Sequence, residues 1–306
     1  MDPGIDDALA LILALKSSEI QVLGITTVAG NAPVEMTSTN ARRVLEHLNI
    51  TSIPVAMGAA KPLEHPLGDA LDYHGPDGLG QCNLPPPRLP LHPAKACDFI
   101  AELVLSTPGE ITLVATGPLS NVALAFERHP KLAKALARLV IMGGAYGLTP
   151  YGKGNRTPFA EFNIWQDPEA ASIVLGSAVD IFAVGLDVST NPTACLNSQH
   201  LEQLEMGHTP SARLATKLIE YAMKRHGRCE LHDPLALAAL LDISLFNFIS
   251  APVEIITGNG WDRGITHILP SDGCHLIADS SQLIHIAAGV DGPRFLNLFL
   301  SRILQE

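Results

Sequence analysis

Short runs of apolar, often β-branched residues alternate with longer amphipathic stretches along most of the chain. The apolar runs predict buried strands at 20–28, 53–57, 111–115, 139–142 and 180–184. The stretches between them predict helices at 8–15, 40–46, 96–105, 121–127 and 168–175. Continuous rather than alternating apolar strands are typical of parallel sheets, which are buried on both faces. The pattern therefore predicts an α/β fold with a mostly parallel, Rossmann-like central sheet flanked by helices.

After about residue 191 the pattern becomes richer in helix. Helices are predicted at 211–224 and 233–241, and a further βαβ-like stretch leads to a helix at 293–304. No Gly/Ser linker, charge run or internal repeat divides the sequence, so residues 1–306 are interpreted as one domain. The Gly-, Pro- and His-rich segment 58–93 is too long for an ordinary connection and is interpreted as an active-site flap.

Composition narrows the class of protein. Hydrophobic residues make up 47% and charged residues 17%, which excludes disordered and fibrous proteins. The net charge of −11 argues against nonspecific nucleic-acid binding, which needs clustered Lys and Arg. No run reaches the roughly 18 apolar residues that a membrane span needs. The acidic first residues are unlike a signal peptide, and five cysteines without a CxxC motif fit the reducing cytoplasm.

Three carboxylates, Asp2, Asp6 and Asp7, stand within six residues, immediately before the helical stretch 8–15. Helix capping needs only one or two of them. Three carboxylates this close repel each other unless a cation is present, and Ca²⁺ or Mg²⁺ prefers such oxygen ligands. Capping and metal binding are both open for this loop. In an open α/β sheet, ligands bind at the carboxyl ends of strands, where we expect the active site.

Other segments that follow strands or begin helices carry similar chemistry. Residues 116–121 form a turn that presents carbonyl and hydroxyl oxygens, although capping by Ser120 explains it equally. His232 and Asp233 begin an apolar helix, where Asp followed by Pro is also an ordinary start. The polar residues Asn155 and 161–163 lie between a Gly-rich strand end and a helix start, and loop hydrogen bonding is the alternative there.

Taken together, these segments resemble the inosine–uridine preferring nucleoside hydrolases, a family of nucleoside N-ribohydrolases. The matching segments are DPGIDDALAL, ITTVAGN, DYHGPDGLG, LVATGPLSNVALA, VIMGGAY, AEFNIWQDPEAA and LHDPLALA. They follow the family's order and spacing across nearly the whole chain. The resemblance implies Ca²⁺-dependent hydrolysis of the N-glycosidic bond of ribonucleosides to ribose and free base, in nucleoside salvage.

The resemblance also implies roles for individual residues. Asp2 would be a Ca²⁺ ligand and the general base, and the other ligands would be Asp7, the Thr116 carbonyl and Asp233. The ribose would be bound by Asp6, Asn31, Asn155, Glu161 and Asn163, with Met142 against the sugar. His74 and His232 would lie near the base and assist its departure. The partner would be a small-molecule ribonucleoside, with no nucleic acid or membrane, and the enzyme would be a cytoplasmic homodimer or homotetramer.

One departure from the family's pattern concerns the first residues. The family has an apolar strand before this loop, ending in a further Asp, in a D-x-D-P-G arrangement. Here Met1 directly precedes Asp2, so we expect that strand to be missing from residues 1–306. A central strand buries several apolar side chains at roughly 1.5–3 kcal/mol each. We therefore expect both folding and metal binding to depend on it.

Two other functions remain open from the residues alone. One is a Mg²⁺-dependent phosphohydrolase with an aspartyl nucleophile, although the acidic loop has no nearby Lys or Arg to bind phosphate. The other is a noncatalytic nucleoside- or Ca²⁺-binding protein. The base pocket is least defined, and its preference for purine or pyrimidine is open. Its candidates precede His232 and are Tyr221, Arg225, His226, Arg228 and Glu230.

Overall fold

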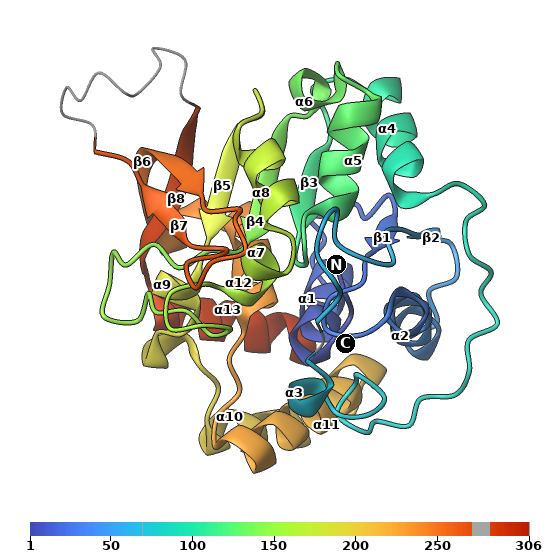
Figure 1. The fold of residues 1–306 in the computed structure, drawn as a ribbon. Coiled ribbons are helices and arrows are strands. Elements are labelled where there is room, and N and C mark those ends of the chain that lie inside the picture. The colour runs from blue at the N-terminus through green and yellow to red at the C-terminus, as the bar shows by residue number, and fades with distance from the viewer. Residues whose placement is uncertain (69, 271–281, 306) are drawn as a thin grey trace.

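The strands of the computed structural model form two sheets, which lie side by side near the centre of Figure 1. The structure describes residues 1–68, 70–270 and 282–305. The smaller sheet pairs β1 (Ile25–Thr27) with β2 (Val55–Met57). The larger sheet has the order β3-β4-β5-β8-β6-β7, namely Thr112–Ala115, Arg138–Met142, Ile181–Val184, Leu283–Val290, Phe246–Ile255 and Thr266–Ile268. All pairs except those of β6 are parallel, which confirms the predicted mostly parallel sheet.

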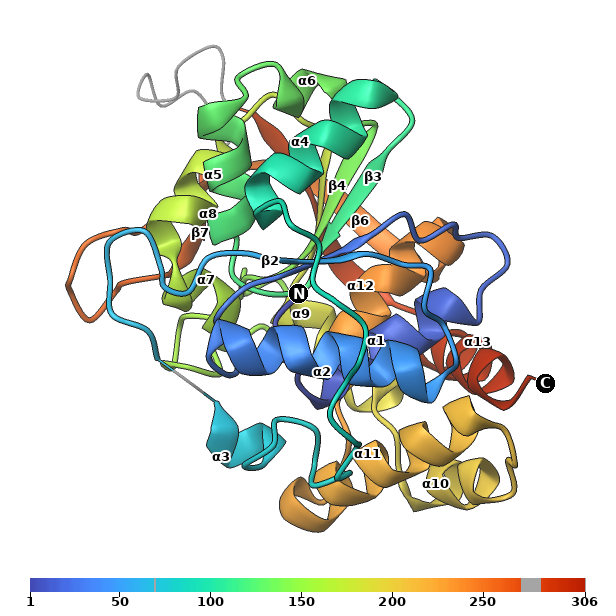
Figure 2. The same cartoon turned by 90° about the vertical axis from the view of Figure 1, so that its right-hand side faces the viewer.

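Helices cover both faces of these strands, as Figure 2 shows. On one side lie α4 (Ala96–Ser106), α5 (Ser120–Arg128) and α8 (Pro168–Leu175). On the other lie α1 (Ile5–Leu15), α12 (His232–Leu241) and α13 (Gly292–Leu304), with α10 (Ser198–Glu205) and α11 (Pro210–His226) beyond them. The remaining helices are α2 (Val34–His47), α3 (Leu71–His74), α6 (Leu132–Ala135), α7 (Phe162–Gln166) and α9 (Leu186–Ser189), with 3₁₀ turns at Pro192–Ala194 and Ile243–Leu245.

Alternate residues of β4 face two separate apolar cores. Leu139 and Ile141 pack in the core formed with α4, α5 and α8. Val140 and Met142 pack in the core formed with α1, α11, α12 and α13. All four side chains are buried. A strand buried on both faces has no polar face to alternate with, which is why the sequence shows continuous apolar runs. Because both cores share the same strands, the described residues form a single α/β domain.

Two predicted elements differ from the structure. The strand predicted at 20–28 is regular only at Ile25–Thr27. The βαβ-like stretch before the last helix is wrong, since β6 runs antiparallel to both β7 and β8. Among the described residues between β6 and β8 there is no helix. Antiparallel strands can follow one another through short connections, so no crossover helix is needed there. The segment 58–93 is largely irregular, with α3 inside it.

The first helix places the acidic loop at the carboxyl ends of the parallel strands. Helix α1 begins directly after Gly4, and Leu9, Ile12 and Leu13 are fully buried within the fold. The loops that follow β1, β3 and β4 start at 28, 116 and 143. These three loops and the start of α12 form the candidate active site. No helix in the described part of the chain is long and apolar enough to cross a bilayer.

Candidate active site

Asp7 ties the acidic loop together through four hydrogen bonds. Its Oδ1 accepts from the Asp2 backbone N–H at 3.1 Å and from the Thr116 hydroxyl at 3.0 Å. Its Oδ2 accepts from the Gly4 backbone N–H and from Asn31 Nδ2, each at 3.1 Å. The bond to Gly4 satisfies a free N–H at the start of α1. Helix capping therefore explains part of the role of Asp7. It does not explain why Asp2 and Asp6 are carboxylates.

Further carboxylates converge on Asp7. One oxygen from each of Asp6, Asp7 and Asp233 lies within 4.8 Å of the others, although Asp233 comes from the far end of the sequence. Asp2, Asp7 and Asp233 are buried. Among the described residues, Asp2 Oδ1 and Asp6 Oδ1 are shielded from solvent and have no hydrogen-bond partner. The structure therefore joins Asp6, predicted as a ribose ligand, to two of the predicted metal ligands.

The electrostatics of this cluster call for a positive charge. Burial, and then the charge of Asp7, raises the pKa of Asp6 to about 7. Burial and the same neighbour raise the pKa of Asp2 well above its usual value, and burial with three neighbouring carboxylates does so for Asp233. The four neighbouring carboxyl groups of the cluster, Asp7 included, cannot all ionise without a cation beside them. Two unpartnered buried oxygens in an all-oxygen donor set fit a hard divalent cation such as Ca²⁺.

A second polar group lies beside this cluster, at the start of α7. Glu161 Oε1 accepts from Asn163 N at 2.7 Å, and its Oε2 accepts from the backbone N–H groups of Gly144 and Ile164 at 3.1 and 3.0 Å. Asn163 Nδ2 donates to the carbonyls of Met142 at 3.1 Å and Thr116 at 3.3 Å. These bonds hold Glu161 and Asn163, both buried, at the ends of β3 and β4.

Thr116 connects the two groups. Its hydroxyl donates to Asp7 and its carbonyl accepts from Asn163, so the predicted carbonyl ligand lies between them. Asn31 also belongs here, because its backbone N–H donates to Asp2 Oδ2 at 2.7 Å. Asn155 differs from the other predicted ribose ligands. Its side chain is exposed and accepts from the Phe162 backbone N–H at 2.8 Å, which places it at the outer edge of α7.

The flap segment 58–93 brings His74 against the acidic loop. His74 is buried, and its Nδ1 accepts from the Ile5 backbone N–H at 3.0 Å. Burial, followed by the charges of His232 and His226, lowers the pKa of His74 to about 3. The ring is therefore neutral near pH 7 and carries its proton on Nε2. Asn40 Nδ2 donates to the carbonyls of Pro3 and Asp77 at 3.3 and 2.9 Å, which fastens the flap to the loop.

His232 lies in a hydrogen-bond network that the sequence does not predict. Its Nδ1 is 2.8 Å from the Ser189 hydroxyl, and its Nε2 is 3.4 Å from Glu230 Oε2. Burial would raise the pKa of Glu230, but the hydrogen bond and charge of His232, and then Arg228, lower it to about 2. Burial opposes charge on His232, yet Glu230 and then Asp6 and Glu161 raise the pKa of the imidazole. The available signal was the spacing of Glu230 two residues before His232.

The other base-pocket candidates fall into two groups. Tyr221 packs beneath the flap, where a Cβ on Gly80 would lie 2.9 Å from the Tyr221 Cβ. His226 stacks on Tyr73 of the flap, with centroids 4.1 Å apart and planes at 11°. Arg225 and Arg228 are exposed, and Arg228 pairs with Glu230 at 2.5 Å. Tyr73 was not predicted, because its stacking partner is distant in sequence.

Comparisons with known proteins agree on one family. A family model for inosine-uridine preferring nucleoside hydrolases matches residues 1–297. The pyrimidine-specific ribonucleoside hydrolase RihA of Shigella boydii serotype 4 (strain Sb227) is 37% identical over 309 residues, covering 99% of this chain and 96% of that protein. The protein of the same name from Salmonella arizonae (strain ATCC BAA-731 / CDC346-86 / RSK2980) is 36% identical with the same coverage.

Solved structures of nucleoside hydrolases are also similar to this chain. A plant nucleoside hydrolase superposes with a TM-score of 0.94 and 32% identity, covering 100% of this chain and 98% of its own. A purine-preferring ribonucleoside hydrolase from Gardnerella vaginalis has a TM-score of 0.90 and 29% identity, covering 99% of this chain and 96% of its own.

Proposed function

The chain belongs to the inosine-uridine preferring nucleoside hydrolase family and is a ribonucleoside N-glycosidase, and from this premise we propose how its site works and what it prefers. We propose that it is a Ca²⁺-dependent hydrolase that releases ribose and free base in nucleoside salvage. Of the three functions that the sequence left open, family membership favours this one over a phosphohydrolase or a noncatalytic binding protein.

One observation carries the proposed mechanism: the buried Asp2 Oδ1 has no hydrogen-bond partner among the described residues. In contrast, Asp2 Oδ2 accepts from the Asn31 backbone N–H, so the carboxylate is held with one oxygen free. Burial raises the pKa of Asp2, which makes it a stronger base than an exposed carboxylate. Asp2 is therefore the group that takes a proton from the attacking water.

The remaining side chains hold the sugar and the leaving base. Breaking an N-glycosidic bond builds positive charge on the ribose, as in other glycoside hydrolyses. Asp6, Glu161 and Asn163 supply carboxylate and amide oxygens beside the acidic cluster, where they can bind ribose hydroxyls. Glu230 favours the protonated form of His232, which suits His232 to give a proton to the departing base.

Ca²⁺ is proposed from the donor set. Asp2, Asp7, Asp233 and the Thr116 carbonyl would hold the ion, and the position of Asp6 within 4.8 Å of two of them makes it a further candidate. When bound, Ca²⁺ would supply positive charge that makes a nearby water molecule easier to deprotonate. It also offsets the mutual repulsion that raises the pKa values of these buried carboxyl groups.

We propose a preference for pyrimidine ribonucleosides. It is supported by the relatives that are 36–37% identical over nearly the whole chain and are named pyrimidine-specific. The purine-preferring structural neighbour is less similar, at 29% identity. The chemistry of the ribose contacts is common to all ribonucleosides, so the preference would depend on the flap and on α11, where Tyr73 and Tyr221 lie.

A substrate panel tests these proposals together. Uridine, cytidine, inosine and adenosine are assayed for free ribose with EDTA, with EDTA followed by excess CaCl₂, and with EDTA followed by excess MgCl₂. We expect ribose from uridine and cytidine to exceed that from the purine nucleosides, and activity to return with CaCl₂ only. Full activity in EDTA, with no calcium found by elemental analysis, would refute the metal assignment. Faster release from inosine or adenosine would refute the base preference.

We further propose a cytoplasmic homo-oligomer. The described cysteines, Cys82, Cys97, Cys195 and Cys229, are buried free thiols, which suits a reducing compartment. Trp261 and Phe159 are 78% and 54% exposed and lie edge to face, with centroids 6.0 Å apart. Exposed aromatic surface of this kind supports subunit contact. Light scattering after gel filtration would give the mass, and a monomer of 32.5 kDa would refute the assembly.

A further inference from the structure

Asp187 is a buried carboxylate that lies on α9, outside the acidic cluster. Its two oxygens accept hydrogen bonds from backbone N–H groups of the loop that follows β4. Oδ2 accepts from Tyr146 N at 2.7 Å, and Oδ1 accepts from Leu148 N and Thr149 N at 2.6 and 3.1 Å. The Thr149 hydroxyl also donates to the Asp187 carbonyl at 2.7 Å. Because bonds to a charged acceptor are stronger than neutral ones, Asp187 holds this loop firmly against α9.

Gly144 connects the same loop to the proposed ribose site. Its N–H donates to Glu161 Oε2 at 3.1 Å, and its carbonyl accepts from the Leu186 N–H, at the start of α9, at 2.9 Å. Gly144 has a φ of +95°, and an added Cβ would lie 2.5 Å from the ring of Tyr146. The backbone at Gly144 is therefore fixed between α9 on one side and Glu161 on the other.

Tyr146 keeps the turn 143–146 in one shape. Its side chain is buried, and its hydroxyl donates to the Gly143 carbonyl at 3.3 Å. A Cβ on Gly185, the residue before α9, would lie 2.9 Å from the Tyr146 ring and 2.6 Å from the Gly144 carbonyl oxygen. The turn and the start of α9 are thus closely packed. A displacement of Tyr146 would therefore displace Gly144 as well.

We propose that Asp187 is a positioning residue for ribose binding, which acts through Tyr146 and Gly144 on Glu161. This inference rests on the proposed role of Glu161 in holding a ribose hydroxyl. Glu161 Oε1 accepts from Asn163 N and has a second lone pair for such a hydroxyl, while Oε2 is held by Gly144. A binding carboxylate has to be fixed to within roughly 0.5 Å. Asp187 contributes to that precision from the far side of the turn.

Asp187→Asn tests this role with a side chain of the same shape. An amide has only one acceptor oxygen, so either Tyr146 or the pair Leu148 and Thr149 loses its partner. We expect the KM for uridine to rise roughly tenfold, while kcat stays within a few-fold of the parent value. The KM for a p-nitrophenyl riboside should rise by the same factor, because both substrates carry the same sugar. A loss confined to uridine would place the effect at the base and overturn the proposal.

Gly152→Ala displaces the same carboxylate without replacing it. A Cβ at Gly152 would overlap Asp187 Oδ1, which cannot move without breaking its bonds to Leu148 and Thr149. The KM should rise as in Asp187→Asn, and Gly152→Ala alone decides if Asp187→Asn does not fold. Amide hydrogen exchange at Gly144 should quicken at least about tenfold in both variants, because its N–H loses a fixed acceptor. That measurement needs no substrate.

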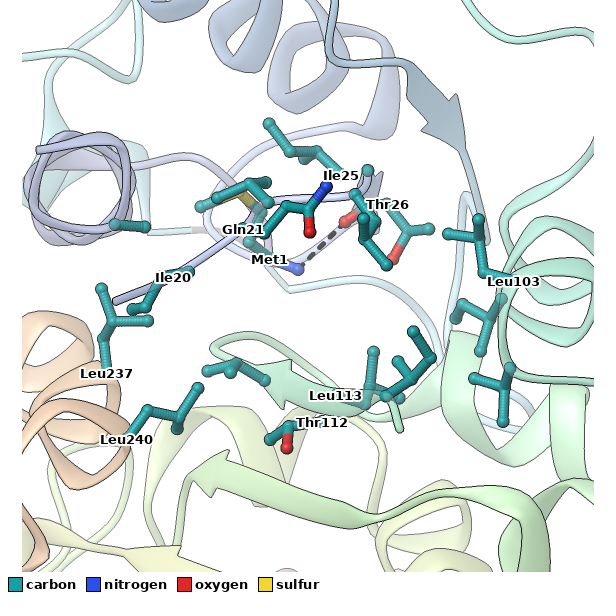
Figure 3. Close-up of a pocket in the computed structure, with 18 of the residues that line it drawn as sticks. Met1, Ile20, Gln21, Ile25, Thr26, Leu103, Thr112, Leu113, Leu237 and Leu240 are labelled. Atoms are coloured by element: carbon teal, nitrogen blue, oxygen red, sulfur yellow. Dashed lines mark hydrogen bonds between the residues drawn. The ribbon is translucent and has the colours of Figure 1, made fainter. Parts of the chain in front are cut away.

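Leu103→Ala is the control for a general loss of stability. Leu103 lies in the wall of the groove between the two sheets, which Figure 3 shows. Among the described residues, the lining of this groove includes none from the turn 143–146 or from α9. The control should lower the midpoint of thermal unfolding and leave both the KM and the exchange at Gly144 at the parent values. An equal rise of the KM in this control would overturn the proposal.

Glu161→Gln separates this inference from the proposed function. We expect it to raise the KM for both substrates, since it removes the charge that binds the hydroxyl. If it does so while Asp187→Asn and Gly152→Ala change neither the KM nor the exchange at Gly144, the role of Asp187 is overturned and that of Glu161 stands. An unchanged KM in Glu161→Gln would overturn the ribose role itself, and the inference with it, even if exchange at Gly144 quickens in the other variants.

Discussion

The Thr116 hydroxyl donates a 3.0 Å hydrogen bond to Oδ1 of Asp7, although the two residues are 109 positions apart. This contact joins the carboxyl end of β3 to the start of α1. It makes the acidic cluster a product of tertiary structure, because each carboxylate depends on partners from other segments.

Asp7→Ala should remove bound calcium and turnover together. The substitution deletes a proposed ligand and four hydrogen bonds that hold Asp2, Gly4, Asn31 and Thr116. Elemental analysis and ribose release measure the two effects on the same preparation. Asp72→Ala, an exposed carboxylate on the flap, is the control and should keep both. Full calcium occupancy in the Asp7 variant would contradict the assignment.

Asp2→Asn tests the proposed general base while preserving the shape of the side chain. The amide cannot accept a proton from water near neutral pH, so kcat for uridine should fall by roughly 10²–10⁴. The KM should change much less, provided that assays contain saturating CaCl₂. A kcat within a few-fold of the parent would show that another group is the base.

His232→Ala should slow cleavage of uridine by roughly 10²–10⁴ if His232 protonates the departing base. A p-nitrophenyl riboside has a leaving group that departs without a proton, so its cleavage should fall far less. A structural His232 would disturb the neighbouring Asp233 and lower both rates alike. Equal losses on the two substrates would therefore reject the acid role and direct attention to His74.

Glu230→Gln should move the basic limb of the pH–rate profile to lower pH. Glu230 raises the pKa of His232, and an acid catalyst is lost as the pH rises through its pKa. Removing the negative charge lowers that pKa, so activity at pH 8 should fall more than activity at pH 6. Arg213→Gln, an exposed charge change on α11, should leave the profile in place. An unshifted profile would show that Glu230 does not tune the acid.

The calcium-free chain should lose stability as the pH rises from about 4 to above 7. In the folded chain the pKa of Asp6 is raised to about 7, so the folded state holds a proton that the unfolded state releases near pH 4. Ionisation of the folded group then costs stability across that window. Unfolding midpoints measured in EDTA should decline with pH, and excess CaCl₂ should reverse the decline. A midpoint in EDTA that rises over this range would contradict the prediction.

Gly80→Ala should raise the KM by displacing the flap from Tyr221. Gly80 has a φ of +59°, and an added Cβ would lie 2.9 Å from the Tyr221 Cβ. Gly109→Ala is the matched control, since Gly109 has a φ of +82° with nothing within 4 Å of an added Cβ. Both variants should lose about 1 kcal/mol of unfolding free energy from backbone strain. Only Gly80→Ala should alter the KM, and equal KM values would contradict the proposed contact.

Much of the fold could be predicted from the sequence because its signals are local. The loop of Asp2, Asp6 and Asp7 is local too, whereas the place of Asp233 beside it was implied only by the family resemblance. Strands such as β4 are buried on both faces and appear as continuous apolar runs, and the helix of α8 begins with a clear Asp167–Pro168 signal. The direction of β6 could not be predicted, since a short apolar run does not specify whether its neighbour is parallel or antiparallel.

The contacts around His232 could not be predicted from the sequence, for a different reason. Ser189 is 43 residues from His232, and their hydrogen bond exists only because the end of α9 meets the start of α12. The same holds for Tyr73 and His226, whose rings meet when the flap lies on α11. The exposed position of Asn155 could not be predicted either, because its loop has no periodic pattern.

The burial of α1 limits which amino-acid substitutions the enzyme can tolerate. Because Leu9, Ile12 and Leu13 have no exposed surface, the helix that carries Asp6 and Asp7 cannot shift without opening the core. The carboxylates therefore gain their positions from the same packing that keeps the chain folded. Variation that displaces this helix would therefore also damage folding, whereas exposed flap positions such as Asp72 lie outside that core. New substrate ranges should arise in the flap, with the acidic cluster inherited unchanged.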